Sequence, residues 1–290
     1  MKWWGWGDPE SRLELPDSAI GMLRNELGVE AGDATEHVEL AAMELPEPRP
    51  LQEAVRAATG EANVLTDAEH RLRRSAGRGY PDLGRLRSGK REAAPDAVLV
   101  PAAAGRVAAA LEACASSDVA VVPFGGGTSV VGGVEPERGT HRAVVALDLS
   151  SLREVDLDRR SLTARLGPGL RGPDAEAALA GLRVTLGHFP QSFEQATIGG
   201  FAATRSAGQA SSGYGRFDEL VTAIELTAPA GVLRTLAIPH TAAGPSLRQL
   251  VLGSEGTLGV ITEVSCRVRP APKQRLYEGW MAPDFAGGCE

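Results

Sequence analysis

Cysteine is scarce in this sequence, and its scarcity excludes several classes of protein. The chain has 290 residues and only three cysteines, Cys114, Cys266 and Cys289, which lie far apart. Their odd number and wide spacing exclude a disulfide-rich secreted scaffold, and no Cys/His spacing is typical of a zinc site. We therefore expect a reduced, cytoplasmic protein without a metal site.

Long apolar runs are also missing. No stretch reaches the roughly 18 consecutive apolar residues that a membrane-spanning helix requires. The N-terminal sequence MKWWGWGDPE has no continuous apolar segment of the kind that forms the core of a signal peptide. We expect neither a spanning helix nor a secretory leader.

Excess positive charge is the third absence. The net charge is −7, so no overall basic surface is available to replace the counterions of a nucleic acid. One local exception is residues 67–95, a segment rich in Arg and Gly that we interpret as a long surface loop. Seven of its basic residues form a cluster in the sequence, Arg71, Arg73, Arg74, Arg78, Arg85, Arg87 and Lys90. This cluster is either solvated or a contact for an anionic ligand or partner.

The first 94 residues differ in pattern from the rest of the chain. They predict a loosely ordered helical and irregular arm, with helices over 17–28 and 51–60. The first helix has Asp17 or Ser18 as its expected N-cap and Gly28 as its end, and a glycine also ends the second.

From residue 95 short apolar strands alternate with helices, which predicts an α+β fold. Strands are expected within 96–101, 119–124, 141–152 and 161–170, with helices over 102–118 and 174–184, the second opened by Asp174. A second unit begins near residue 185 with an aperiodic segment of a length that is typical of a binding loop. It continues with two strands joined by a PAG turn, a helix, and a strand that ends at Pro270.

The stretch AVVPFGGGTSVVGG, residues 120–133, is the most informative local pattern. Consecutive amides without a Cβ can form an anion nest close to a diphosphate, and the Thr128 and Ser129 hydroxyls can add hydrogen bonds. The stretch is not a P-loop, because the lysine of that motif is missing. It is a poor Rossmann fingerprint, because its first three glycines are contiguous and no amphipathic helix follows them.

Four segments together carry a resemblance to a known family. VPFGGGTSVVGG, GHFPQSFEQATIGGFAATRSAGQ, YGRFDELV and LVLGSEGTLGVITEV occur in this order along the chain. Together they resemble the FAD-binding PCMH-type domain of the vanillyl-alcohol oxidase flavoprotein family, and within it most resemble the alkyldihydroxyacetonephosphate synthases. The resemblance implies a PCMH-type FAD-binding fold of two α/β subdomains. It also implies an arm over 1–94, an FAD-binding domain over 95–275, and the start of a missing cap domain over 276–290.

The resemblance also implies cofactor-binding residues. One segment would wrap the FAD diphosphate, a second would run along the flavin side, a third would form a contacting turn, and a fourth would lead into the last strand. In that order these residues are Pro123, Phe124, Gly125, Gly126, Gly127, Thr128 and Ser129; Gln191, Ser192, Phe193, Glu194, Gln195, Ala196 and Thr197; Thr204, Arg205, Ser206 and Ala207; and Glu255, Gly256, Thr257, Leu258, Gly259, Val260 and Ile261. Covalent attachment in the wider family uses a histidine or a cysteine. Here Thr128 stands at the loop position, so we expect noncovalent FAD.

His188, in LGHFPQS, is the one histidine in a candidate site. It is either a structural histidine at the start of a loop or a catalytic residue that serves as general acid/base or anion partner. The resemblance favours the catalytic role. Tyr214 and Arg205 are weaker candidates.

The resemblance implies a redox-neutral reaction, in which a fatty alcohol replaces the acyl chain of an acyl dihydroxyacetone phosphate to give an ether-lipid precursor. The expected partner is a small-molecule or lipid-phosphate substrate and not a nucleic acid, while peripheral membrane contact and a homodimer stay open. Two other functions also stay open. One is an FAD-linked 2-hydroxy-acid dehydrogenase or oxidase of the D-lactate type, and the other is an inactive flavin-binding fragment.

Overall fold

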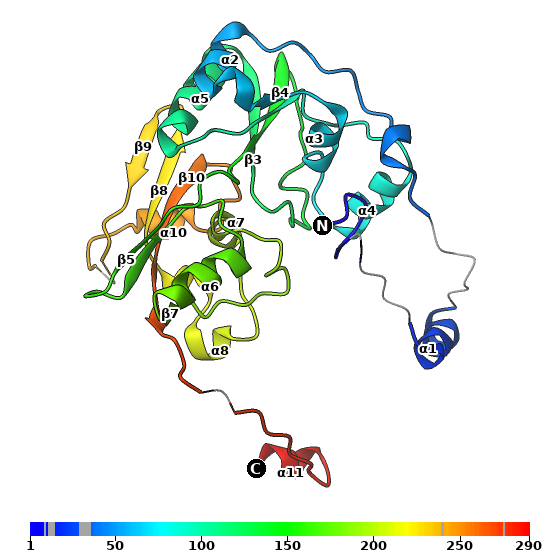
Figure 1. Ribbon diagram of the computed structural model, residues 1–290, viewed down its shortest axis with the longest axis vertical. Coiled ribbons are helices and arrows are strands. Elements are labelled where there is room, and N and C mark those ends of the chain that lie inside the picture. Colours follow the sequence, from blue (N-terminus) through cyan, green and yellow to red (C-terminus); the bar gives the residue numbers. More distant parts are fainter. Residues whose placement is uncertain (9, 11–14, 29–35, 239–240, 275) are drawn as a thin grey trace.

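The computed structural model describes residues 1–8, 10, 15–28, 36–238, 241–274 and 276–290. Two main sheets, with the helices that pack on them, form the centre of the molecule, and the N-terminal helix and the C-terminal segment extend away from it (Figure 1). Within those ranges, no helix combines the length and the apolar character needed to cross a bilayer. The expected α+β class is confirmed.

The first sheet has the strand order β1-β2-β4-β3. Its strands are β1 (Val64–Leu65), β2 (Ala97–Leu99), β3 (Val119–Phe124) and β4 (Ala143–Asp148), and β2, β4 and β3 run parallel. The central strand β4 is buried along its whole length, as is usual for a parallel strand covered on both faces. Helix α5 (Ala104–Ser116) connects β2 to β3, and α2 (Glu53–Thr59) packs against it.

The second sheet is antiparallel, with the order β5-β6-β10-β8-β9. Its strands are β5 (Val155–Asp158), β6 (Thr163–Leu166), β8 (Val221–Ala228), β9 (Gly231–Arg234) and β10 (Val260–Arg267). The helices of this unit are α6 (Gly172–Gly181), α7 (Ile198–Ala203), α8 (Ser211–Tyr214), α9 (Phe217–Leu220) and α10 (Leu247–Val251). A short pair, β7 (Val184–Thr185) with β11 (Arg269–Pro270), closes one end. The buried side chains of α6, α7 and β8 and most of those of β10 form one core, and the first sheet has another, to which Val260 at the start of β10 belongs.

Most expected elements are found where the patterns placed them, but two cap assignments were wrong. Helix α1 (Asp17–Leu27) begins after Pro16, so Asp17 lies in its first turn, while Gly28 ends it in the left-handed conformation as expected. Helix α6 begins after Arg171, so Asp174 again lies in the first turn. In both cases the carboxylate lies near the positive end of the helix dipole without capping a backbone N–H group.

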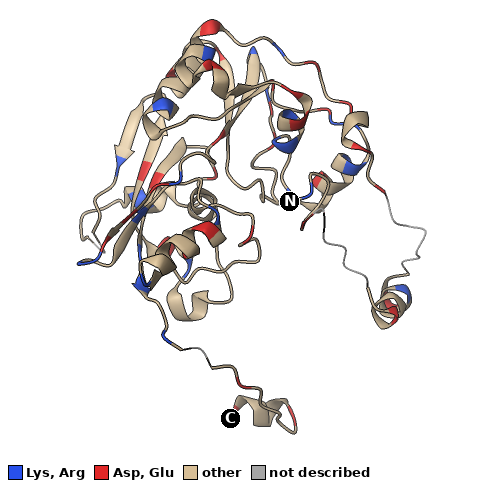
Figure 2. Cartoon of the chain, viewed as in Figure 1, with Lys and Arg blue, Asp and Glu red and all other residues tan. Residues whose placement is uncertain are grey.

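The interpretation of residues 67–95 as a surface loop was also wrong. The segment contains α3 (Ala68–Arg73) and α4 (Tyr80–Arg87), whose basic residues lie near the N-terminus (Figure 2). Asp67 caps α3 by accepting a hydrogen bond from the backbone of His70, and a proline opens α4, so the start signals of both helices were present in the sequence.

Two arginines of the predicted basic cluster are buried within this segment. Arg71 and Arg78 are only 4% and 5% exposed. Arg71 donates from Nε to the carbonyl of Pro95 at 2.7 Å, and Arg78 donates from Nη1 to the carbonyl of Gly77 at 2.7 Å. Backbone carbonyls therefore satisfy these guanidinium groups in part, and the cluster is not a uniformly solvated one.

The arm is more closely packed than its pattern suggested. Trp3, Leu72 and Leu86 form a small core of their own, and β1 extends the first sheet by pairing with β2. The remaining short helices are 3₁₀ turns at Leu40–Ala42 and Glu61–Asn63 and the terminal α11 (Phe285–Cys289). The expected domain bounds stay a prediction, and residue 275 lies outside the described residues.

Candidate functional site

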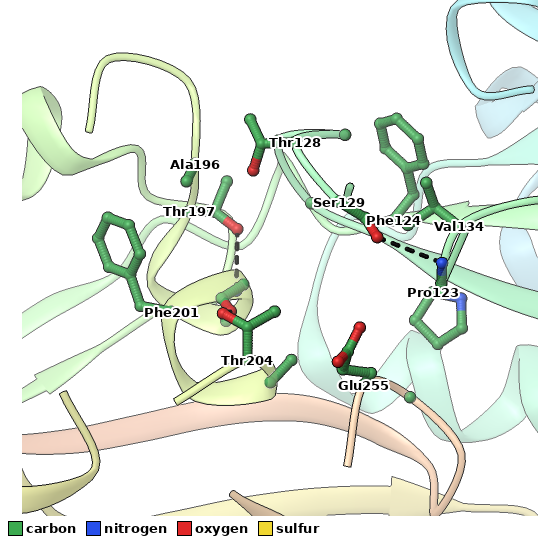
Figure 3. A pocket seen from close by; sticks show the side chains of 18 of the residues that line it. Pro123, Phe124, Thr128, Ser129, Val134, Ala196, Thr197, Phe201, Thr204 and Glu255 are labelled. Atoms are coloured by element: carbon green, nitrogen blue, oxygen red, sulfur yellow. Dashed lines mark hydrogen bonds between the residues drawn. The ribbon is translucent and has the colours of Figure 1, made fainter. Parts of the chain in front are cut away.

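A cavity of about 390 Å³ lies between the two sheet units. It is bounded by the loop that follows β3, by the segment that contains α7, and by the turn that precedes β10 (Figure 3). Its lining residues are Pro123, Phe124, Gly125, Gly126, Gly127, Thr128, Ser129, Val130, Val131, Gly133, Val134, Leu149, Pro168, Ser192, Ala196, Thr197, Gly199, Gly200, Phe201, Ala203, Thr204, Ser206, Glu255, Gly256, Gly259 and Ile261.

The glycines of the first wall are required by close packing against the second. A Cβ on Gly125 would overlap the Thr197 hydroxyl, and a Cβ on Gly126 would overlap the carbonyl oxygen of Gln195. Gly127 has a φ of +65°, a left-handed conformation that side chains other than glycine rarely adopt. The contiguous glycines therefore let two backbone segments meet at the cavity.

The same loop offers a run of backbone donors. In the part of the chain that the structure describes, the N–H groups of residues 125–131 donate to no other protein group. Folded proteins satisfy nearly all buried N–H groups, and residues 125–129 line the cavity in buried or half-buried positions, so their donors without protein partners fit an anionic ligand. The Ser129 hydroxyl accepts from the backbone of Gly133 at 3.2 Å, which holds the following turn in place.

The second wall is built around helix α7. Thr197 is its N-cap and accepts a hydrogen bond from the Gly200 backbone at 3.2 Å, and Gly199 packs closely against Pro168. Hydroxyl groups of Thr197 and Thr204 are therefore carried on opposite ends of one short helix at the cavity (Figure 3).

His188 lies behind this second wall and does not line the cavity. Its side chain is fully buried, with the residue 1% exposed, and its Nε2 lies 3.0 Å from the Ser206 hydroxyl. Burial lowers the pKa of His188 to about 4, so the ring is neutral near neutral pH. The Phe201 and Phe217 rings pack against it, with centroids 4.8 and 5.1 Å away. His188 can act on a ligand in the cavity only through Ser206.

The third boundary is the turn before β10. Glu255 has a φ of +48°, and its carboxylate points into the cavity near Ser129 (Figure 3). The backbone of this turn is tied to the end of α7, because Gly253 and Glu255 donate to the carbonyls of Ala202 and Ala203 at 3.0 and 3.1 Å.

Arg205 lies outside the cavity although it was a predicted contact. Its Nε donates to the carbonyl of Leu252 at 2.9 Å, and its Nη1 pairs with the buried carboxylate of Asp218 at 3.1 Å. Arg205 therefore positions the turn before β10. Tyr214 is also remote: it packs against Gly187 and lies under the guanidinium of Arg269, 5.1 Å from the ring centroid.

More than half of the predicted cofactor-binding residues line the cavity, and the others lie outside it. Those that do not line it are Gln191, Phe193, Glu194, Gln195, Arg205, Ala207, Thr257, Leu258 and Val260, together with His188. Lining residues that were not assigned are Val130, Val131, Gly133, Val134, Leu149, Pro168, Gly199, Gly200, Phe201 and Ala203. The continuation of the glycine loop and the glycine pair of ATIGGF were visible signals, whereas nothing local in the sequence marks Leu149 or Pro168. The roles of the predicted residues stay predictions.

Comparisons with known proteins agree with this geometry. Residues 95–237 match the family described as FAD binding domain. Alkyldihydroxyacetonephosphate synthase of Caenorhabditis elegans is 29% identical over 99% of this chain, and that of Trypanosoma brucei brucei is 34% identical over 85%. The chain spans 52% and 41% of these relatives, about half of their length.

A solved structure and a more distant relative complete the comparison. A structure of alkyldihydroxyacetonephosphate synthase superposes with a TM-score of 0.83 at 30% identity, covering 94% of this chain and 55% of that chain. A mitochondrial D-lactate dehydrogenase [cytochrome] of Arabidopsis thaliana is 33% identical over 63% of this chain and 32% of its own length.

Proposed function

We propose that the cavity holds FAD noncovalently, because residues 95–237 belong to the FAD binding domain family. The chain would then be the FAD-binding part of an alkyldihydroxyacetonephosphate synthase-like enzyme. The fold is the α+β PCMH-type FAD-binding fold, which agrees with the TM-score of 0.83 to a synthase structure. The reaction is the exchange of an acyl for an alkyl chain on dihydroxyacetone phosphate.

The observation that carries the cofactor site is the run of backbone donors at residues 125–131. A diphosphate carries negative charge that these amides can bind without a basic side chain. The cavity also suits the size of a cofactor, because pockets of about 300–1,000 Å³ are typical of such ligands.

The lining residues support noncovalent binding. No histidine or cysteine is among the described residues that line the cavity. Cys114 and Cys266 are buried in the two cores, and burial raises the pKa of the Cys114 thiol to about 12, which leaves it unreactive. His188 is separated from the cavity by Ser206.

Bound FAD supplies a ring that accepts and returns electrons, and the protein contributes binding and orientation. The amides of residues 125–131 bind the charged part, and the hydroxyls of Thr197, Thr204 and Ser206 lie where they can orient the remainder. The close contact of Gly125 and Gly126 with the second wall keeps the two walls at a fixed separation.

A charge placed at Thr128 tests the cofactor site without disturbing the packing of the glycines. Thr128 lines the cavity within the loop, so Thr128→Asp should weaken FAD binding by at least about 30-fold through repulsion of the diphosphate. The matched neutral variant Thr128→Asn should change affinity by only a few fold. Fluorescence titration of FAD measures both, and raised salt should partly restore the Asp variant. Equal affinities of the two variants would contradict the placement of the diphosphate.

The reaction is tested separately with the FAD-loaded chain. One assay supplies an acyl dihydroxyacetone phosphate with a labelled fatty alcohol, and the other supplies D-lactate with a dye acceptor. Label incorporated into the phosphate product supports the proposal. Reduction of the dye would instead support a 2-hydroxy-acid dehydrogenase. The 33% identity to a D-lactate dehydrogenase is the observation that favours this second function. FAD binding without either turnover would identify the chain as a flavin-binding part without activity of its own.

A further inference from the structure

Ser206 is held unusually firmly for a residue that lines the cavity. Its backbone N–H donates to the carbonyl of Phe201 at 3.0 Å, and its carbonyl accepts from the backbone of Phe217, also at 3.0 Å. Its hydroxyl lies 3.0 Å from His188 Nε2. The backbone and one direction of the hydroxyl group are therefore fixed before any ligand binds.

One ring nitrogen of His188 has a hydrogen-bond partner, the Ser206 hydroxyl, and the other has none among the described residues. Among the described residues, the buried Nδ1 atom has no hydrogen-bond partner. The residue is 1% exposed, and the rings of Phe201 and Phe217 pack against it. Because burial lowers the pKa of His188 to about 4, the ring carries one N–H and one lone pair at neutral pH. The hydrogen is therefore on either Nε2 or Nδ1.

The burial of Nδ1 decides between the two tautomers. With the hydrogen on Nδ1, a donor would be buried without an acceptor, and such orphaned N–H groups are rarer in proteins than acceptors that lack a donor. With the hydrogen on Nε2, the ring donates to Ser206 and only a lone pair at Nδ1 is left without a partner. The second arrangement is the more favourable.

The tautomer of His188 determines where the hydroxyl hydrogen of Ser206 can point. When Ser206 accepts from His188, its own hydroxyl hydrogen is free to turn toward the cavity that the residue lines. We propose that His188 is a positioning residue that makes Ser206 a hydrogen-bond donor to an acceptor atom of the bound cofactor. This inference rests on the proposed FAD site, and it assigns a function to a histidine that does not itself contact the cavity.

The tautomer can be measured on the protein without FAD. Long-range ¹H–¹⁵N correlation spectra distinguish a protonated Nε2 from a protonated Nδ1, and a His188→Gln variant identifies the signals of His188. We expect a neutral ring protonated at Nε2 between about pH 6 and pH 8. A ring protonated at Nδ1, or at both nitrogens, would overturn the inference.

Two pairs of variants test the consequence for binding. Ser206→Ala should weaken FAD binding by about 3- to 10-fold, the usual effect of one neutral hydrogen bond, while Ser212→Ala, at an exposed serine of α8, should leave it unchanged. His188→Gln keeps a donor near the position of Nε2 and should retain the affinity, whereas His188→Met should lose it to the same extent as Ser206→Ala.

The outcomes separate this inference from the proposed function. Failure of the unmodified chain to bind FAD would remove the proposed site itself. Normal binding with equal affinities for Ser206→Ala and the unmodified chain, or for the folded Gln and Met variants, would overturn the role of His188 alone. Thermal unfolding of each variant shows whether a change in affinity comes from lost structure.

Discussion

The two walls of the cavity are held by different physical forces. The glycine wall is held by polar contacts with the N-terminal arm: the backbone N–H of Arg78 donates to the carbonyl of Ser129 at 2.6 Å, and Glu135, just beyond the loop, forms ion pairs with Arg91 at 2.9 Å and Arg85 at 3.2 Å. The wall around α7 is held by neutral packing, with His188 packed against two phenylalanine rings and hydrogen-bonded to Ser206.

The two walls are therefore sensitive to different substitutions. The supports of the glycine wall come from the N-terminal arm, so they depend on ion pairs between segments far apart in sequence. The support of the other wall depends on a histidine that must stay uncharged. Loss of a charge should therefore damage the first wall, and gain of a charge should damage the second.

The largest expected effect is loss of the Arg91 support. Arg91 is 2% exposed and also donates to the carbonyl of Ser75 at 2.5 Å. Arg91→Met removes the buried partner of Glu135, which keeps its pair with Arg85, and leaves the Ser75 carbonyl without its donor, so the free energy of unfolding should fall by about 2–4 kcal/mol. Urea unfolding measures it, with Arg160→Met at an exposed position as a near-neutral control. Equal midpoints for the two variants would show that the arm does not support the glycine wall.

The next effect concerns the contact between the walls. In Gly126→Ala the new Cβ meets the carbonyl of Gln195, a backbone atom that cannot simply turn away. Overpacking of this kind costs about 1–3 kcal/mol, and we expect the upper end together with weaker FAD binding. Gly105→Ala, in α5 with open space around it, should be neutral or slightly stabilising. Unchanged stability and FAD affinity in Gly126→Ala would contradict this expectation, because they would show that the two walls can move apart without cost.

The smallest expected effect is a dependence of stability on pH through His188. The pKa of His188 is about 4 in the folded protein, below its unfolded value of 6.5, so the unfolded chain takes up the proton first as the pH falls. The contribution to stability is complete above about pH 6.5 and is lost toward pH 4, amounting to about 2 kcal/mol between about pH 8 and pH 5. Unfolding of His188→Gln across the same range should lack this part of the pH dependence. An unchanged slope in that variant would assign the acid sensitivity to other groups.

The sequence predicts that residues 125–127 belong to a ligand-binding loop. It does not predict the close packing against the second wall that requires glycine at positions 125 and 126. Three consecutive glycines at 125–127 lack Cβ atoms, and this feature is compatible both with an anion nest and with a close crossing of two backbone segments. The crossing partner, Gln195 to Thr197, lies some seventy residues away in sequence. Only the fold shows that packing between the walls already requires these glycines.

The arginines of residues 67–95 were misjudged for a related reason. Local composition rich in Arg and Gly predicts solvent exposure, because most arginines are exposed. Arg71 is buried against the carbonyls of Pro46 and Pro95, Arg91 against that of Ser75, and Arg78 against that of its neighbour Gly77. No sequence pattern reports which carbonyls will be nearby.

The class of fold, the order of the main strands and helices, and the segments that meet at the cavity could all be predicted from the amino-acid sequence. Those features follow from apolar periodicity, turn residues and four ordered motifs, all of which are local. That Ser206 and not His188 faces the cavity, that Arg205 holds a turn, and that the arm supports the glycine loop are visible only in the folded structure. These outcomes depend on burial and on partners remote in the chain, which exist only once the backbone has closed around them.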